Sequence, residues 1–230
     1  MKLLITAGAT REPLDAVRFI SNVSTGYTGA ALADALSAAG HAVMLLHGEG
    51  AVKGKVDCQH GTFSSAADLF RQLQALLAGG EYEAVIMAAA VSDYRPAQLI
   101  KGKISSDADE LTVRLVRNTK ILPQLKTFSA KPLRVVGFKL TSGATAHERQ
   151  AAVASQFAAG GVDVVVQNDL QEIRAVGRER HPFRIHQEPD AKPTVTEGVM
   201  ALATALAEIL AVDVSAGSKR ERPIDQSTLQ

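Results

Sequence analysis

Residues 1–10 read Met1-Lys2-Leu3-Leu4-Ile5-Thr6-Ala7-Gly8-Ala9-Thr10, a short apolar run that ends in a turn of small residues. Such a run, bounded by turn residues, is typical of a strand that is buried on both faces of a parallel sheet. The next helix opens only at Ser24-Thr25-Gly26-Tyr27-Thr28-Gly29, and its alanine and leucine residues recur at helical spacing until Gly40. The N-terminal sequence therefore predicts a strand, a long glycine-bearing connection and a helix at 26–39.

Four further apolar runs alternate with helical patterns along the chain. After the first strand, we predict strands at 42–46, 84–87, 133–136 and 162–166. After the first helix, we predict helices at 65–78, 119–128, 145–159 and 196–211. Strands that alternate with helices predict an α/β fold with a doubly wound, mostly parallel sheet.

Two segments depart from this alternation. Residues 109–116 alternate in part, which predicts a small accessory strand outside the main sheet. Residues 90–108 form a long polar loop, and a loop of that length inside a compact domain is often a lid or a binding segment. This loop is therefore a candidate part of a functional site.

The composition is that of a globular chain with one core. Of the 230 residues, 46% are hydrophobic and 21% are charged, and a chain of this length can bury one sizeable core. We predict one domain at 1–211. Residues 212–230 lack any apolar period, so we predict a disordered tail there.

Several classes of function are disfavoured by the same composition. Because 25 Lys and Arg balance 24 Asp and Glu, the positive excess of a dedicated nucleic-acid binder is missing. No apolar run approaches the ~18 residues of a membrane span, and the N-terminus does not read as a signal peptide. The single cysteine, Cys58, and six histidines without ligand spacing predict no metal site built by the protein. We expect small-molecule partners, no membrane partner and a cytoplasmic location.

The first strand and the first helix supply a candidate phosphate site. In an open α/β sheet, ligands bind at the carboxyl ends of the strands, and a helix N-terminus favours anions. The residues placed there are Gly8, Ser24, Gly26 and Gly29. An ordinary tight turn is the alternative for these glycines. Asn22 precedes the helix and would either cap it or bind an acyl phosphate.

Other predicted strand ends carry further candidates, each with a structural alternative. Ala89 and Ala90 leave room for a ligand after the third strand, and Asp93 would accept hydrogen bonds from a substrate or cap a turn. Phe138 would stack on a base or belong to the core, and Asn168 would bind a base edge or form an Asx turn. In the long loop, Lys101 and Lys103 would neutralise phosphates or remain solvated.

The order and spacing of these segments resemble one family closely. The segments that carry the resemblance are 6–15, 17–22, 24–26, 88–94 and 136–140, read as TAGATREPLD, VRFISN, STG, AAAVSDY and VGFKL. They are similar to the phosphopantothenate-cysteine ligases, also called phosphopantothenoylcysteine synthetases, and the resemblance extends from residue 2 to about residue 210.

The resemblance implies a Rossmann-like, dimeric ligase of coenzyme A biosynthesis. In that family, 4'-phosphopantothenate is activated by a nucleoside triphosphate to an acyl-nucleotide, with release of pyrophosphate, and cysteine then forms the amide. Mg2+ is expected with the nucleotide. The chain resembles the stand-alone form, so no flavin is expected.

The family's site residues correspond to positions of this sequence. The resemblance gives Asn22 and Lys103 catalytic roles, at the acyl phosphate and in the flap. It gives substrate contacts to Asn22, Ala89 and Ala90. Nucleotide contacts fall on Gly8, Ser24, Gly26, Gly29, Asp93, Phe138 and Asn168.

Cationic residues of the family are replaced at several positions here. Fused bacterial members have two lysines after the Lys-Ile of the flap and a basic residue after the helix-loop glycine, where this chain has Ser105, Ser106 and Tyr27. The usual lysine before Asp163 is also missing. Both CTP and ATP therefore stay open as the nucleotide.

Two other functions are compatible with parts of the pattern. An NAD(P)-dependent oxidoreductase would share the α/β alternation and would use Glu49, near the end of the second strand, to bind a ribose. The stretched glycine loop is unlike the compact motif of such enzymes. A non-catalytic, nucleotide-binding relative of the ligase would explain the replaced lysines.

Overall fold

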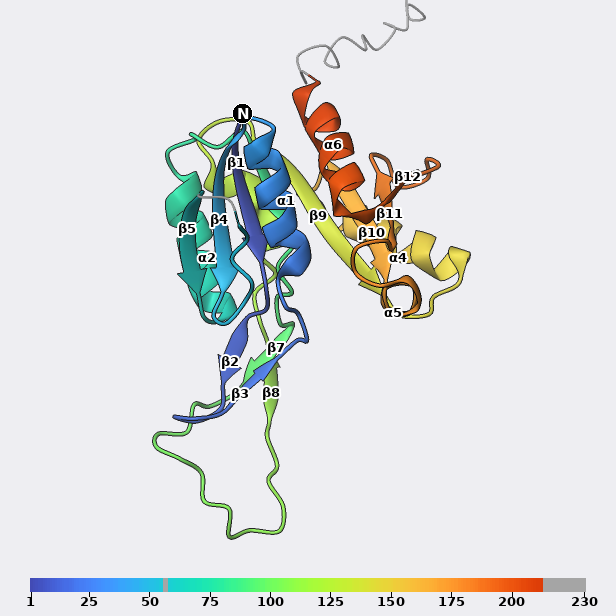
Figure 1. The fold of residues 1–230 in the computed structure, drawn as a ribbon. Helices are drawn as coiled ribbons and strands as arrows, with labels where there is room; N and C mark the ends of the chain where they lie inside the picture. Colours follow the sequence, from blue (N-terminus) through green and yellow to red (C-terminus); the bar gives the residue numbers. More distant parts are fainter. Residues whose placement is uncertain (56–57, 213–230) are drawn as a thin grey trace, which may run out of the picture.

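The computed structural model describes residues 1–55 and 58–212. Its centre is one eight-stranded sheet in the order β12-β11-β10-β9-β6-β1-β4-β5 (Figure 1). The strands are β1 Lys2–Ala7, β4 Ala42–Gly48, β5 Gln59–Phe63, β6 Ala84–Met87, β9 Arg134–Thr141, β10 Val164–Asp169, β11 Pro182–His186 and β12 Thr194–Glu197. Neighbours from β5 to β10 are parallel, whereas β11 and β12 are antiparallel additions.

Helices cover both faces of this sheet. They are α1 Tyr27–Ala38, α2 Ala66–Leu77, α3 Leu125–Phe128, α4 Ala146–Ala158, α5 Leu170–Val176 and α6 Gly198–Ala211. One buried cluster joins Leu3 and Ile5 of β1 to α1 and α6. A second cluster joins Leu4 of β1 to α2 and α3 on the other face. Because successive strand residues point to opposite faces, the run Leu3-Leu4-Ile5 serves both cores, and the predicted doubly wound α/β fold is confirmed.

Local signals in the sequence account for several helix ends. Ser65 caps α2, and its buried Ala66, Leu69, Leu73 and Leu77 recur at helical spacing. Thr145 and Glu148 form a capping box at the start of α4. Gly40, with a φ of 85°, follows the end of α1.

Two small hairpins lie outside the main sheet. In the first, β2 Arg11–Pro13 pairs with β3 Phe19–Ser21, and in the second, β7 Tyr94–Pro96 pairs with β8 Leu115–Arg117. Figure 1 shows both hairpins below the body of the molecule, with the long loop between β7 and β8 extending further away. The predicted accessory strand is therefore real and outside the sheet, but it spans 115–117 and not 109–116.

Other predicted boundaries also need correction. The helix expected at 119–128 is instead a 3-10 turn, Leu122–Gln124, followed by α3. Pro123 is tolerated in a first turn but not inside a helix, so it sets the start of this segment. The polar loop expected at 90–108 contains β7. The tail predicted at 212–230 lies, from residue 213 on, outside the described residues.

Candidate functional site

A cavity of about 500 Å³ opens at the carboxyl ends of the parallel strands. Its walls come from the loop that enters α1, the segment after β6, the end of β9, and the segment from Asn168 to His181. The chain moves from β1 to β4 on one side and returns to β6 on the other, so β1 and β6 flank the switch point of the sheet. Ligands of open α/β sheets bind at this point, and the volume is within the range of small-molecule sites.

The loops after β1 and β6 are joined directly by backbone hydrogen bonds. The N–H of Ala90 donates to the carbonyl of Gly8 at 2.8 Å, and the N–H of Thr10 donates to the carbonyl of Ala90 at 3.2 Å. Gly8 has a φ of 80°, and a Cβ there would lie 2.6 Å from Cβ of Ala51. Gly8 therefore holds the two loops together behind the cavity and is not one of the residues that line it.

The N-terminus of α1 lies against β1 because Gly29 has no side chain. A Cβ on Gly29 would lie 2.7 Å from Cβ of Ala7 and 2.8 Å from the carbonyl oxygen of Thr6. Gly26, the N-cap, has a φ of 80° and gives no side-chain cap, although the N–H of Tyr27 donates to Oγ1 of Thr25 at 3.4 Å. The next N–H groups of the first turn therefore face the cavity without a capping side chain, and they favour an anion there.

Replacing Gly29 with alanine should lower the free energy of unfolding by about 2 kcal/mol, because the new Cβ overpacks against backbone that cannot move easily. Urea unfolding measures this change. Gly79→Ala is the matched control, since a Cβ there would meet only the side chain of Glu81, at 3.7 Å. Equal stability of the two variants would contradict the close contact between α1 and β1.

The charged side chains that line the cavity are both arginines. Arg174 belongs to α5, and Arg178 follows Gly177, beyond the end of that helix. Nη1 of Arg178 donates to Oγ1 of Thr25 at 3.2 Å, so this guanidinium lies beside the loop that enters α1. No carboxylate is among the described residues that line the cavity. Two cations and a helix N-terminus without an opposing acid make a site for a phosphate-bearing ligand.

Asp169 fixes the wall that carries Asn168. Its buried carboxylate accepts four hydrogen bonds, from Oγ1 of Thr141 at 2.7 Å and from the N–H groups of Gly143, Ala144 and Gln171. Burial by itself raises the pKa of this carboxyl, but these hydrogen bonds outweigh burial and hold the pKa well below its usual range. The end of β9, the end of β10 and the start of α5 are thereby joined at one anion.

Seven of the residues singled out in the sequence line this cavity. They are Ser24, Gly26, Gly29, Ala89, Ala90, Phe138 and Asn168. Phe138 also makes an edge contact with Phe183, with ring centroids 6.4 Å apart, so it belongs partly to the core. The cavity joins parts of the chain that lie far apart in sequence, from Val23 to His181, as the strand-end argument predicts.

Of the residues to which the resemblance gives a site role, four lie elsewhere. Besides Gly8, these are Asn22, Asp93 and Lys103. Nδ2 of Asn22 donates to the carbonyl of Val91 at 3.3 Å, next to the lining residue Ala90, and Asn22 does not cap α1. The carboxylate of Asp93 pairs with Nζ of Lys120 at 2.5 Å.

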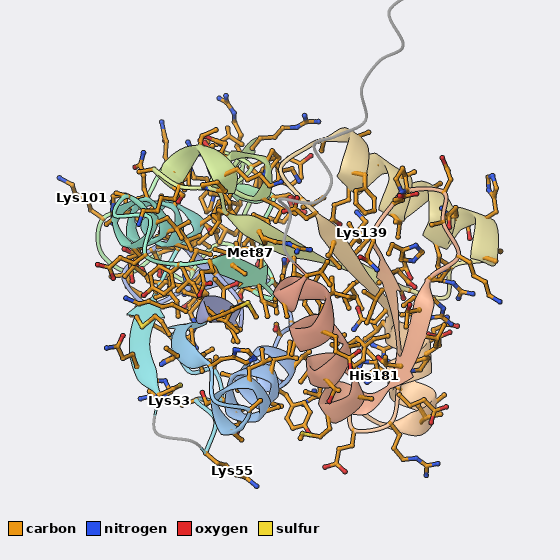
Figure 2. The ribbon with its side chains drawn as sticks, turned by 90° about the horizontal axis from the view of Figure 1, so that it is seen from above. Lys53, Lys55, Met87, Lys101, Lys139 and His181 are labelled. Carbon is orange, nitrogen blue, oxygen red and sulfur yellow. The ribbon has the colours of Figure 1, made fainter. Side chains whose placement is uncertain are left out.

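Lys103 is exposed and is not among the residues that line the cavity. It belongs to the long loop between β7 and β8, which extends away from the body of the molecule in Figure 1. Figure 2 shows Lys101 of the same loop at the opposite side of the molecule from His181, which lines the cavity. Lys101 or Lys103 can therefore contact a ligand in the cavity only if the loop moves, or if the loop reaches the cavity of a second copy of the chain.

Among the lining residues that were not anticipated from the sequence, three have polar side chains, namely Arg174, Arg178 and His181. They follow the last predicted strand, in a stretch with no predicted element, where α5 and β11 bring them back over the cavity. The cluster Arg174, Arg178 and Arg180 is the signal in the sequence that could have indicated them. Within the described part of the chain, no three His, Cys, Asp or Glu side chains gather as a metal site.

Comparison with known proteins points to one family. The model of the family "DNA/pantothenate metabolism flavoprotein C-terminal domain" matches residues 1–212. A curated relative from Thermococcus kodakarensis, "Coenzyme A biosynthesis bifunctional protein CoaBC", is 32% identical over 185 residues, which are 77% of this chain and 45% of that protein. The protein of the same name from Mycolicibacterium smegmatis is 35% identical over 187 residues, 76% of this chain and 44% of that protein. The chain thus spans about half the length of these relatives.

Solved structures share the fold. A "DNA/Pantothenate Metabolism Flavoprotein" from Streptococcus pneumoniae superposes with a TM-score of 0.80 at 24% identity, covering 91% of this chain and 98% of that one. A Cab2 H337A mutant, solved in complex with phosphopantothenate-cysteine, has a TM-score of 0.74 at 20% identity, covering 95% and 88%. Among the helices that the structure describes, none has the length and apolar character needed to cross a membrane.

Proposed function

Because the chain belongs to the DNA/pantothenate metabolism flavoprotein C-terminal domain family, we propose that it joins 4'-phosphopantothenate to L-cysteine in coenzyme A biosynthesis, with CTP or ATP as cosubstrate. The curated relatives are named for coenzyme A biosynthesis, and a structural neighbour was solved with phosphopantothenate-cysteine. The observation that carries the proposal is the cavity at the switch point of the sheet. It combines an uncapped helix N-terminus, two arginines, an aromatic ring and an amide.

The proposed reaction has two steps. A carboxylate oxygen of phosphopantothenate attacks the α-phosphorus of the nucleotide, pyrophosphate leaves, and an acyl-nucleotide results. The amine of cysteine then attacks the acyl carbon and loses a proton to solvent, while the nucleoside monophosphate leaves and the amide remains. Both steps develop negative charge on phosphate oxygens, which the N–H groups of α1 and the guanidinium of Arg178 are placed to stabilise.

Other residues have positional roles in this proposal. Asn22, next to the cavity, would hold the acyl phosphate, and Ala89 and Ala90 leave space for the pantothenoyl part. Ser24, Gly26 and Gly29 would contact the triphosphate, and Phe138 and Asn168 the base. Asp93 would contact the nucleotide after exchanging its partner Lys120.

The cavity does not offer the carboxylate through which proteins usually hold Mg2+, because no Asp or Glu is among its described lining residues. In the proposed reaction, Mg2+ therefore enters as the chelate of the triphosphate and not as a resident ion. A flavin is not part of the proposed chemistry.

The test is pyrophosphate release with 4'-phosphopantothenate, cysteine and Mg2+, comparing CTP with ATP and omitting each component in turn. The proposal expects release that requires both phosphopantothenate and a nucleotide. Nucleotide binding without any release, by folded protein, would instead identify a non-catalytic relative.

Replacing Lys103 with alanine should lower kcat about tenfold, because the flap would lose the cation that it brings to the phosphates. The backbone next to it is held, since the N–H of Ile104 donates to Oδ2 of Asp15 at 3.0 Å. Lys101→Ala, two residues away on the same loop, is the matched control and should keep most of the activity. Unchanged kcat in Lys103→Ala would remove the catalytic role from this residue.

A homodimer completes the proposal. The two hairpins and the loop expose large apolar side chains, among them Val17 and Leu99, each 62% exposed, and Phe19, Tyr94 and Leu115. A second copy would cover them and would bring one flap to the other cavity. Sedimentation of the wild-type protein and of Leu99→Glu tests this; a fully active monomer would contradict it.

No comparable observation favours the NAD(P)-dependent oxidoreductase. Glu49, the acid that would bind a ribose, pairs with Nη1 of Arg11 at 3.5 Å and is not among the cavity's lining residues. A nicotinamide fluorescence titration separates the two functions, since the ligase should not bind the reduced cofactor.

A further inference from the structure

His181 is a buried side chain of the cavity wall that the proposed reaction does not use. It is 1% exposed and packs against the ring of Phe183, with centroids 4.2 Å apart. Its Nδ1 lies 3.0 Å from the carbonyl oxygen of Arg178, and its Nε2 lies 3.5 Å from Nδ2 of Asn168. The ring therefore links a backbone carbonyl to the one side-chain amide among the described residues that line the cavity.

The position of the hydrogen on this ring follows from the partners of its two nitrogens, which include the backbone of Gly177 beside that of Arg178. A carbonyl oxygen can only accept a hydrogen bond, so Nδ1 of His181 carries the hydrogen. Burial lowers the pKa of His181 and outweighs the backbone carbonyls of Arg178 and Gly177, which raise it, so the neutral ring is favoured. A neutral ring with a hydrogen on Nδ1 has an acceptor at Nε2.

The acceptor at Nε2 fixes the orientation of Asn168. Only the NH2 group of the amide can donate to it, so the amide oxygen must point the other way. Asn168 is 8% exposed and lines the cavity, and its Oδ1 accepts no hydrogen bond from any described residue. The lining has no Asp, Glu or Gln side chain, so Oδ1 of Asn168 is the side-chain carbonyl oxygen available to a ligand there.

We propose that His181 is a positioning residue that holds the amide oxygen of Asn168 toward the cavity and so selects nucleobases with an exocyclic amine over those with a carbonyl at that position. Cytosine and adenine present an N–H donor to this oxygen. Uracil and hypoxanthine place an oxygen against it, and two acceptors cannot pair. The inference rests on the proposed nucleotide site and names the class of base that the site takes.

Binding of nucleotides without phosphopantothenate tests the inference separately from the ligase activity. Calorimetric titration compares CTP with UTP and ATP with ITP, pairs that exchange the amine for a carbonyl. One of the two pairs will contain the nucleotide that the wild-type protein binds most tightly. Within that pair, the protein should bind the nucleotide with the amine at least about tenfold more tightly than the nucleotide with the carbonyl. Selective nucleotide binding without pyrophosphate release would contradict the proposed ligase activity but support the inference about His181. Pyrophosphate release without a base preference would support the ligase activity and contradict the inference.

Two variants at His181 separate positioning from packing. His181→Phe keeps a ring against Phe183 but removes the acceptor, so the preference should fall to within about threefold. His181→Gln again offers a carbonyl oxygen to the NH2 group of Asn168 and should restore the preference. His186→Phe is the control, because His186 is a buried histidine outside the cavity. Full selectivity in His181→Phe, or equal binding of both members of each pair by the wild type, would overturn the proposal.

Discussion

Asp169→Asn should lower the free energy of unfolding by about 3 kcal/mol at pH 7, the largest loss of stability that we expect from a single polar substitution in this site. The carboxylate of Asp169 accepts four hydrogen bonds, and an NH2 group in place of one oxygen faces donors that it cannot pair with. Urea unfolding of the variant and of the wild type measures the difference.

The same carboxylate predicts how stability depends on pH. Because the pKa of Asp169 is lower in the folded chain than its usual value of about 3.9, the unfolded chain takes up its proton first as the pH falls. The contribution of Asp169 is therefore fully present above about pH 5 and is lost as the pH falls below its unfolded pKa. The difference in stability between Asp169→Asn and the wild type should shrink over this range.

Asp190→Asn is the control for both measurements. Asp190 is exposed and makes no hydrogen bond with the residues that the structure describes. Its substitution should leave the unfolding curve unchanged at pH 7. If Asp169→Asn is also as stable as the wild type, the four hydrogen bonds do not hold the ends of β9 and β10 together.

The central strands could be predicted because a strand that is buried on both faces has a continuous run of apolar residues. Leu3-Leu4-Ile5 and Val164-Val165-Val166 read as continuous apolar runs since one face of each strand meets α1 or α6 and the other meets α2, α3 or α4. The edge strand β5, Gln59–Phe63, has the sequence QHGTF and buries only Phe63. Backbone hydrogen bonds pair β5 with β4, and they leave no pattern in the side chains from which the strand could be predicted.

Some residues of the candidate site could likewise be predicted from the sequence, and others could not. Topology alone brings Gly26, Ala89, Phe138 and Asn168 to one edge, because parallel strands end there, and this could be predicted without knowing any contact. Arg178 could not, since its neighbour Thr25 is 153 residues away in the chain and the path between them depends on α5 and β11.

Arg178→Ala should raise KM for the nucleotide about tenfold, and Arg178→Glu about a hundredfold, because a charge-assisted hydrogen bond to phosphate is lost and then replaced by repulsion. The side chain reaches Oγ1 of Thr25 in the loop that enters α1, where the triphosphate is proposed to lie. Steady-state pyrophosphate release measures both KM and kcat. Since the proposal has Arg178 bind phosphate both before and during the reaction, kcat should change less than KM.

Arg180→Glu tests whether the effect is local. Arg180 is two residues away and exposed but does not line the cavity, so reversing its charge changes the net charge equally without removing a contact. Its KM should stay within about twofold of the wild type, since an exposed charge away from the ligand is screened by salt. Equal rises of KM in Arg178→Glu and Arg180→Glu would mean that KM depends on the net charge of the protein and not on a local contact between Arg178 and the nucleotide.

The substitution Tyr27→Lys tests whether Arg178 supplies a positive charge that the loop entering α1 lacks. Tyr27 directly follows the N-cap Gly26 and lines the same cavity, and it stands where the resemblance to fused bacterial ligases predicts a basic residue. Tyr27→Lys in the Arg178→Ala background should therefore recover much of the lost affinity, although the ammonium binds phosphate as a point charge and not through two N–H groups. If Tyr27→Lys leaves KM as high as in Arg178→Ala, the two positions do not act on the same phosphate, and the guanidinium acts on Thr25 alone.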